Sequence, residues 1–284
     1  MRRLLLFFAA IASVRAQGYR FEPANVRQGQ VLKLTAPPAV ESARFNNRVV
    51  RLFKQPDNTS FGLMPVGVLT RPGTYKIEWL DSHGAELDSV EVTVASAHFP
   101  KQNVVLTKSL SGLSSTLDER EKVGSFIKEV SDVRYWTEPL ERPIEGCATS
   151  EFGVGRYHNG KPTGDYHAGL DLRGAMGTPI HVAADGTVKL AEQFSLHGGT
   201  VAVDHGQGLE SMYLHMSQIA AKSGERVKAG DVIGYVGSTG RSTGPHLHWT
   251  LYANGEPIDP NQWVHIAPCA AAPARKAKKR VKTT

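Results

Sequence analysis

Between residues 179 and 237 the chain consists of short apolar runs that end in glycine, and this pattern restricts the fold more than any other feature. The runs are PIHVAADGTVKLA at 179–191, TVAVDHGQG at 200–208 and GERVKAGDVIGYVG at 224–237. Short runs rich in Val and Ile are typical of strands, and the glycines that bound them are typical of turns. The sequence therefore predicts β structure throughout this region.

Two histidines follow these runs at a spacing that suits a strand. In a strand side chains alternate faces, so His246 and His248 would point the same way, roughly 6.6 Å apart. His167 and Asp171 also share strand parity, but four residues of straight strand span roughly 13 Å, too far for two ligands of one ion. We therefore expect the backbone to bend between them, and Gly169 is at the midpoint.

Two imidazoles and one carboxylate leave a fourth tetrahedral position for water, which is the arrangement of catalytic rather than structural zinc. Either motif alone occurs often by chance. The context is more specific: GYVGSTGRSTGPHLH at 234–248, SMYLH at 211–215 and HAGLD at 167–171 follow one another in order. Over roughly residues 148–263 the chain resembles the lysostaphin/LytM family of zinc metallopeptidases.

The resemblance implies an antiparallel sheet with a substrate groove. It also implies one zinc ion per chain, held by His167, Asp171 and His248, with His215 and His246 as a catalytic pair that does not bind the metal. In the family an aromatic residue and an acid usually follow the H-L-H motif. Here Trp249 is followed by Thr250, a departure at a position that is not a ligand.

The function implied is that of an exported zinc endopeptidase that hydrolyses peptide cross-links of bacterial peptidoglycan. Zinc would polarise the scissile carbonyl and activate water, one of the two non-ligand histidines would remove the proton, and the other would stabilise the oxyanion. Two alternatives are a catalytically silent module that binds the cell wall or activates another hydrolase, and a biotinyl or lipoyl carrier. A carrier is favoured only by the GDVIG segment at 230–234, which lacks the required lysine at a hairpin tip.

The N-terminus has the features of a secretory signal peptide over residues 1–16: a basic start, a short apolar run and small residues before a cleavage site after Ala16. The apolar run is well below the ~20 residues that span a bilayer. We therefore expect an exported protein, periplasmic or extracellular, without a transmembrane segment.

The net charge of +6 is the sum of +3 in residues 1–16, −3 in residues 17–274 and +6 in the tail. Six basic residues lie in the predicted disordered tail, residues 268–284: Arg275, Lys276, Lys278, Lys279, Arg280 and Lys282. Such a tail could hold an anionic cell-wall or membrane surface. The sequence contains no nucleic-acid fold motif, so we expect no nucleic acid among the partners.

The predicted fold is mainly β. Apolar and polar residues alternate in short segments over residues 17–97, which predicts a small immunoglobulin-like sandwich. Residues 98–146 are predicted to form a helical linker, and residues 147–267 the metallopeptidase domain. In the linker, Thr116 and Glu119 have capping-box spacing before a helix of about sixteen residues. Residues 17–146 carry no catalytic motif, so we expect them to cover the groove or to dock on a wall or partner.

Two cysteines and four further histidines lie outside the motifs described above. Cys147 and Cys269 bracket the catalytic region, and the sequence leaves open whether they pair. His158 lies in the stretch leading to His167 and is a candidate to line the groove. The remaining histidines outside the motifs, His181, His197 and His205, are expected to be structural or solvent-facing.

Overall fold

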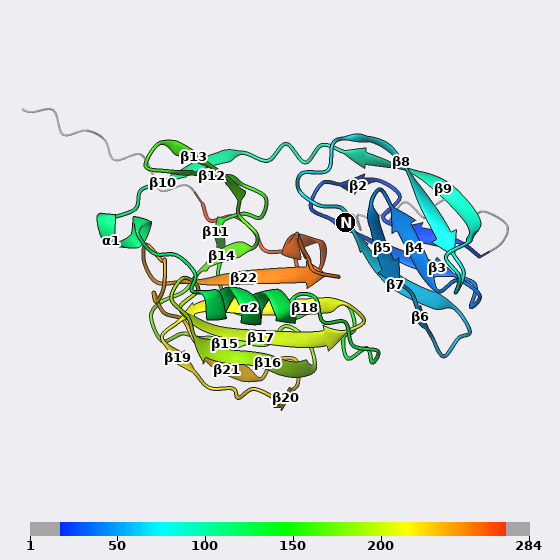
Figure 1. Ribbon diagram of the computed structural model, residues 1–284. Helices are drawn as coiled ribbons and strands as arrows, with labels where there is room; N and C mark the ends of the chain where they lie inside the picture. The colour runs from blue at the N-terminus through cyan, green and yellow to red at the C-terminus, as the bar shows by residue number, and fades with distance from the viewer. Residues whose placement is uncertain (1–17, 271–284) are drawn as a thin grey trace, which may run out of the picture.

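The computed structural model describes residues 18–270, so the predicted signal peptide and most of the predicted basic tail lie outside the described residues. Figure 1 shows two β-rich parts side by side, the N-terminal one in blue and cyan and the C-terminal one in green to orange. None of the helices in the described part of the chain has the length and hydrophobicity needed to cross a bilayer.

The N-terminal part is a sandwich of two sheets. The first sheet has the order β1 (Arg20–Glu22), β3 (Val31–Ala36), β7 (Ser60–Pro65), β6 (Phe53–Lys54). The second has the order β2 (Val26–Arg27), β9 (Glu86–Ala95), β8 (Gly73–Leu80), β4 (Ser42–Phe45), β5 (Arg48–Arg51). Apolar side chains of both sheets, among them Leu34, Ile77 and Trp79, form one buried core. The two sheets were expected, and the immunoglobulin-like strand order stays a prediction.

The connecting segment is less helical than expected. It contains the strand β10 (Lys101–Val104) and two helices, α1 (Lys108–Ser111) and α2 (Leu117–Phe126). The predicted capping box is present at α2: the Thr116 hydroxyl accepts from the Glu119 amide, and the Glu119 carboxylate accepts from the Thr116 amide. A strand in this segment was not foreseen, because its partners lie far along the chain.

Helix α2 is ten residues long, shorter than the expected helix of about sixteen. After Phe126 the backbone makes long-range hydrogen bonds instead: the Ser131 carbonyl accepts from the Gln207 amide, and the Tyr135 amide donates to the His205 carbonyl. Val130 and Val133, which have helical spacing, are consequently exposed. Tertiary pairing overrides the local periodicity here.

The C-terminal part is organised around one antiparallel sheet. Its strand order is β11 (Ala148–Ser150), β14 (Leu170–Arg173), β22 (His246–Ala253), β18 (Leu209–Met216), β17 (Gly199–Gly206), β16 (Gly186–Gln193), β20 (Arg226–Val227), with β23 (Glu256–Ile258) also paired to β22. This confirms the predicted antiparallel sheet. Helix α2 packs on one face, where Phe126 contacts a cluster with Leu190, Met212 and Leu214.

Two smaller sheets and a short helix complete this part. One sheet contains β15 (Pro179–His181), β21 (Val232–Tyr235) and β19 (Gln218–Ile219). The other joins the connecting segment to a hairpin, because β10 pairs in parallel with β12 (Gly155–His158), which pairs with β13 (Lys161–Tyr166). The 3-10 helix η1 (Pro260–Gln262) follows β23.

The two parts share one apolar core. Val31 and Leu63 of the sandwich belong to the same buried cluster as Leu251 and Trp263 of the C-terminal part. Hydrogen bonds reinforce the junction: the Gln262 side chain accepts from the Val31 amide and donates to the Val31 carbonyl, both at 2.8 Å. The junction lies at the end of β22 that is far from His246 (Figure 1).

A disulfide settles the question that the sequence left open. Cys147 and Cys269 are bonded, with Cα atoms 4.9 Å apart. Cys147 directly precedes β11, and the Cys269 amide donates to the Ala148 carbonyl, so the bond fixes the end of the described chain to the edge strand of the main sheet. By the chain-entropy model, closing a loop of this length contributes roughly 4–5 kcal/mol to stability.

One acid is buried in the main sheet without a partner. Glu210 is 1% exposed, and neither of its carboxylate oxygens has a hydrogen-bond partner within the described chain. Burial, and then the nearby charges of Asp204 and Glu129, raise the pKa of Glu210 from 4.5 to about 9. The side chain is therefore neutral in the folded protein at pH 7, whereas in the unfolded chain it ionises above about pH 4.5.

This burial predicts a pH-dependent stability. Between about pH 4.5 and 9 the unfolded state has released the proton of Glu210 and the folded state has kept it, so the free energy of unfolding falls as pH rises. Glu210→Gln is expected to be more stable than the parent by about 3 kcal/mol at pH 7 and no more stable at pH 4. Urea unfolding at both pH values measures this, with the exposed Glu91→Gln as control. Equal stability of Glu210→Gln and parent at pH 7 would contradict it.

Candidate metal centre and groove

The sheet aligns the two histidines of the H-L-H motif as the sequence predicts. His246 and His248 begin β22 and lie on the same face, because the buried Leu247 between them faces the opposite side. The neighbouring strand β14 runs antiparallel, and its register places Asp171 directly opposite His248. Asp171 therefore reaches the same face as the histidines.

The expected bend between His167 and Asp171 is present. Strand β13 ends at Tyr166 and β14 begins at Leu170, so His167 lies in the connection and turns back toward Asp171. Gly169 is required there by close packing. A Cβ atom at this position would lie 2.4 Å from the Trp249 carbonyl oxygen.

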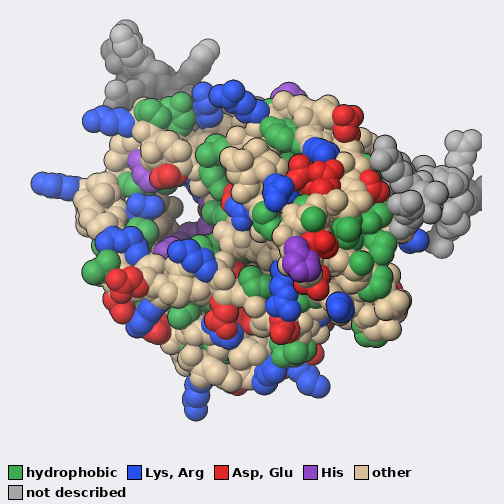
Figure 2. Space-filling view, turned by 45° about the vertical axis from the view of Figure 1, so that its right-hand side comes forward, with side chains coloured by type: hydrophobic (Ala, Val, Ile, Leu, Met, Phe, Trp, Pro, Cys, Tyr) green, Lys and Arg blue, Asp and Glu red, His purple; other side chains and the backbone are tan. Residues whose placement is uncertain are grey.

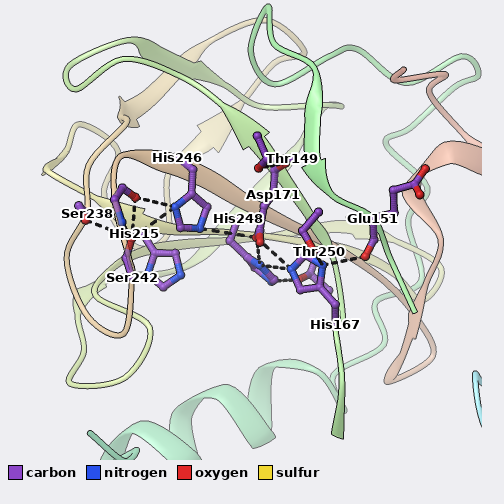
Figure 3. Close-up of polar contacts among 12 residues, drawn as sticks. Thr149, Glu151, His167, Asp171, His215, Ser238, Ser242, His246, His248 and Thr250 are labelled. Carbon is purple, nitrogen blue, oxygen red and sulfur yellow. Dashed lines mark hydrogen bonds and ion pairs between the residues drawn. The ribbon is translucent and has the colours of Figure 1, made fainter. Parts of the chain in front are cut away.

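Three side chains then converge on one point (Figure 3). His167 Nε2 lies 2.9 Å from Asp171 Oδ1 and 3.0 Å from His248 Nδ1, and His248 Nδ1 lies 2.8 Å from Asp171 Oδ1. Three ligand atoms bound to one zinc at about 2.0–2.2 Å are roughly 3.3 Å apart. The three atoms thus need to move by only a few tenths of an ångström to hold the ion.

The outer hydrogen bonds of the two histidines leave their inner nitrogens free to bind a cation. His167 Nδ1 donates to the Glu151 carbonyl at 2.8 Å, and His248 Nε2 lies 3.0 Å from the Thr250 hydroxyl oxygen, which can accept its proton. Without a metal the inner nitrogens can share protons with Asp171, whereas in the tautomers that use both outward N–H groups two nitrogen lone pairs and the Asp171 oxygen face one another. Such a cluster of acceptors fits a metal ion.

The charges of the cluster also suit a cation. Burial acts to raise the pKa of Asp171, but the charges and hydrogen bonds of His167 and His248 outweigh it and hold that pKa well below its usual range. Burial lowers the pKa of His248 to about 4. At neutral pH Asp171 is thus ionised and His248 is neutral, the protonation states that metal ligands require.

The other two motif histidines lie beside this cluster. His246 Nε2 is 3.6 Å from Asp171 Oδ1, and the ring centroids of His215 and His246 are 5.0 Å apart. His246 Nδ1 donates to the Gly244 carbonyl and His215 Nδ1 to the Thr239 carbonyl, each at 2.8 Å. Both outward nitrogens are occupied, so both Nε2 atoms are free to act as proton acceptors.

His215 has an unusual backbone conformation. Its φ is 64°, in the left-handed region that costs a non-glycine residue of order 1–3 kcal/mol. The conformation persists because the amide of His215 donates to the His197 carbonyl and its ring is fixed by Thr239. Burial, together with His248 and His246, lowers the pKa of His215 to about 3, so the ring is neutral at pH 7.

The four histidines and Asp171 lie in a groove of about 700 Å³. Its walls come from the β10 segment, the β12–β13 hairpin and the loop before β22, and Figure 2 shows the hollow with histidines at its bottom. Among residues 18–97 none lines the groove, so the sandwich does not cover it. Residues 102–106, which precede the catalytic region in the sequence, form one wall of the groove.

Two further histidines line the groove. His158 was a candidate for this position. His197 is both structural and at the wall: its Nδ1 lies 2.6 Å from Glu119, whose carboxylate also accepts from the Leu196 and His197 amides. His205 is fully buried.

Several groove residues were not foreseen. Gln102, Arg156 and Arg241 line the groove, but none lies in a metal-binding motif. Arg241 falls within the segment 234–248 that carries the resemblance, and Arg156 lies eleven residues before His167, but neither was singled out. Gln102 has no sequence signal, because its place depends on the long-range pairing of β10 with β12.

Comparisons with known proteins agree with this geometry. Residues 165–260 match the family model described as Peptidase family M23. The DD-carboxypeptidase/endopeptidase Mpg of Neisseria meningitidis is 41% identical over 112 residues, which are 39% of this chain and 26% of that protein. The peptidoglycan DD-endopeptidase ShyA of Vibrio cholerae is 40% identical over 93 residues, 33% of this chain and 22% of that protein. The chain thus spans about a quarter of the length of these curated relatives.

One solved structure resembles most of the chain. A protein of Pseudomonas aeruginosa described as a candidate M23 peptidase superposes with a TM-score of 0.63 at 29% sequence identity. The match covers 84% of this chain and 94% of that one, so it extends well beyond the catalytic region. The mainly β architecture is therefore one that an M23 protein adopts.

Proposed function

Because residues 165–260 form a domain of peptidase family M23, we propose that this protein is an exported zinc endopeptidase that hydrolyses peptide cross-links of bacterial peptidoglycan. The observation that carries the proposal is the convergence of His167 Nε2, His248 Nδ1 and Asp171 Oδ1 in a groove, beside two more histidines. The relatives named peptidoglycan DD-endopeptidases support the substrate class. The disulfide supports export, since such bonds persist in oxidising compartments.

The three ligands His167, Asp171 and His248 would hold one zinc ion. When bound there, zinc supplies a Lewis acid that polarises the scissile carbonyl and lowers the pKa of water toward ~7. Three protein ligands leave a position open for water or substrate. Thr250, which stands where the family usually has an acid, supplies a hydrogen-bond partner for His248.

The catalytic pair would handle the proton. His215 and His246 both present an unprotonated Nε2 to the groove, so either one can accept the proton of the attacking water. The histidine that receives it becomes a donor at the same atom and can return the proton to the leaving amine. The second histidine, whose ring centroid lies 5.0 Å from the first, can stabilise the developing oxyanion only when its own Nε2 carries a proton, because a bare nitrogen cannot donate to an oxygen anion.

The proposal is tested by digestion of purified dimeric muropeptides of defined cross-link, with products identified by mass spectrometry. We expect the zinc-loaded mature protein to release monomers, a chelator to stop the reaction, and added zinc to restore it. Muropeptides with D-amino-acid cross-links and with glycine bridges are compared in parallel. If the zinc-loaded protein cleaves neither kind, the peptidoglycan assignment is wrong.

A further inference from the structure

The groove is rich in positive charge. Its lining contains three arginines, Arg156, Arg173 and Arg241, and two acids, Asp165 and Asp171. Asp171 pairs with Arg156, so among these five side chains the lining carries one net positive charge. In Figure 2, Lys and Arg side chains lie at several points around the hollow, and acidic side chains lie near its rim as well.

Arg156 is held in place deep in the groove. Its side chain is 14% exposed, its Nη2 lies 3.4 Å from Asp171 Oδ2, and its Nη1 donates to Gln102 Oε1. The same Gln102 oxygen accepts from the Ser150 hydroxyl at 3.0 Å. A guanidinium has five N–H donors, so several remain for a ligand after these two contacts.

Arg241 provides a second, unengaged guanidinium. Its backbone amide donates to the Leu196 carbonyl at 2.9 Å, which anchors the loop before β22. Within residues 18–270 its guanidinium forms no hydrogen bond or ion pair, although the side chain lines the groove. Burial, followed by the charges of Arg241 and Arg156, lowers the pKa of His158. Both arginines therefore act on the same part of the groove.

We propose that Arg156 and Arg241 form a carboxylate-binding subsite that selects peptides with a free carboxylate on the residue after the scissile bond. Guanidinium and carboxylate match in a bidentate geometry, which gives this pairing its specificity. The carboxylate of that residue lies within about 4 Å of the scissile nitrogen, and Arg156 is within hydrogen-bonding reach of the ligand Asp171. The subsite rests on the proposed peptidase function and narrows its substrates to acidic cross-links rather than neutral glycine bridges.

The first test compares two cross-linked muropeptides that differ only at this carboxylate, one free and one converted to the carboxamide. A hydrogen bond to a charged group contributes strongly to binding. We therefore expect the kcat/KM of the parent protein to be about 10- to 100-fold higher for the free acid than for the amide. Arg241→Gln should reduce this preference at least several-fold through KM, with kcat little changed. Arg71→Gln, an exposed arginine of the sandwich, is the matched control and should retain the full preference.

The second test needs no turnover. Acetyl-D-alanyl-D-alanine and its C-terminal amide are titrated into chelator-treated protein and followed by NMR, so that no metal can bind the carboxylate. We expect the acid to bind at least tenfold more tightly, and Arg241→Gln and Arg156→Gln to lose the difference. Zinc content is measured in Arg156→Gln, since Arg156 also contacts Asp171.

The outcomes separate the two proposals. If the protein cleaves acid and amide muropeptides equally well and binds both probes equally, the subsite is overturned while the peptidase stands. If no muropeptide is cleaved but the acid still binds more tightly and depends on Arg241, the peptidase assignment fails and the subsite stands. Loss of zinc without loss of the binding difference in Arg156→Gln would make Arg156 a positioning residue for Asp171 and remove it from the subsite.

Discussion

Asp171→Ala and His248→Ala are expected to give folded proteins that no longer retain zinc. Each change removes one of three converging donor atoms, and we expect zinc affinity to fall by more than about 100-fold, beyond the effect of losing a supporting contact. The fold should persist, because the strands β14 and β22 are held by backbone pairing and a buried core. Metal analysis after gel filtration and circular dichroism measure the two outcomes.

His83→Ala is a matched control for the ligand variants. His83 is exposed in the sandwich, so its removal takes away an imidazole without touching the groove. This variant should contain as much zinc as the parent. Full zinc occupancy in both Asp171→Ala and His248→Ala would refute the ligand assignment.

His215→Ala and His246→Ala should behave in the opposite way, keeping zinc and losing activity. Their Nε2 atoms face the groove but are not among the three converging donors, so metal affinity should change little. Loss of a proton-transfer group costs about 10²–10⁴ in rate, and we expect kcat/KM on a dimeric muropeptide to fall by that factor. Zinc content is measured on the same preparations.

The exposed His265→Ala serves as the control for this pair and should have parental kcat/KM. A fall in activity that follows loss of zinc would make His215 or His246 a ligand instead. Normal turnover of either variant at full zinc content would exclude that residue from the mechanism.

Features set by local sequence could be predicted. Strand alternation placed His246 and His248 on one face, and the capping box of Thr116 and Glu119 marked the start of α2. The bend at Gly169 was also predicted, because His167 and Asp171 could not both bind one ion from a straight strand. The structure shows that glycine is required there because the Trp249 carbonyl lies too close for a Cβ atom.

Features set by long-range pairing could not be predicted. The pairing of β10 with β12 brings Gln102 to Arg156, and nothing in either local sequence signals the other. For the same reason the length of α2 was overestimated, since its end depends on contacts with residues 205–207. The bond between Cys147 and Cys269 likewise required the fold, because the two residues are 122 positions apart.

The core shared by the sandwich and the C-terminal part has a consequence for how the protein loses its structure. Val31 and Leu63 cannot leave the cluster without exposing Leu251 and Trp263 to water. Unfolding of one part therefore also destabilises the other part. Contacts of this kind couple segments into one cooperative unit. The protein should therefore melt in a single transition, and a chain shortened to begin near Glu145 would expose this core and lose the wall that carries Gln102.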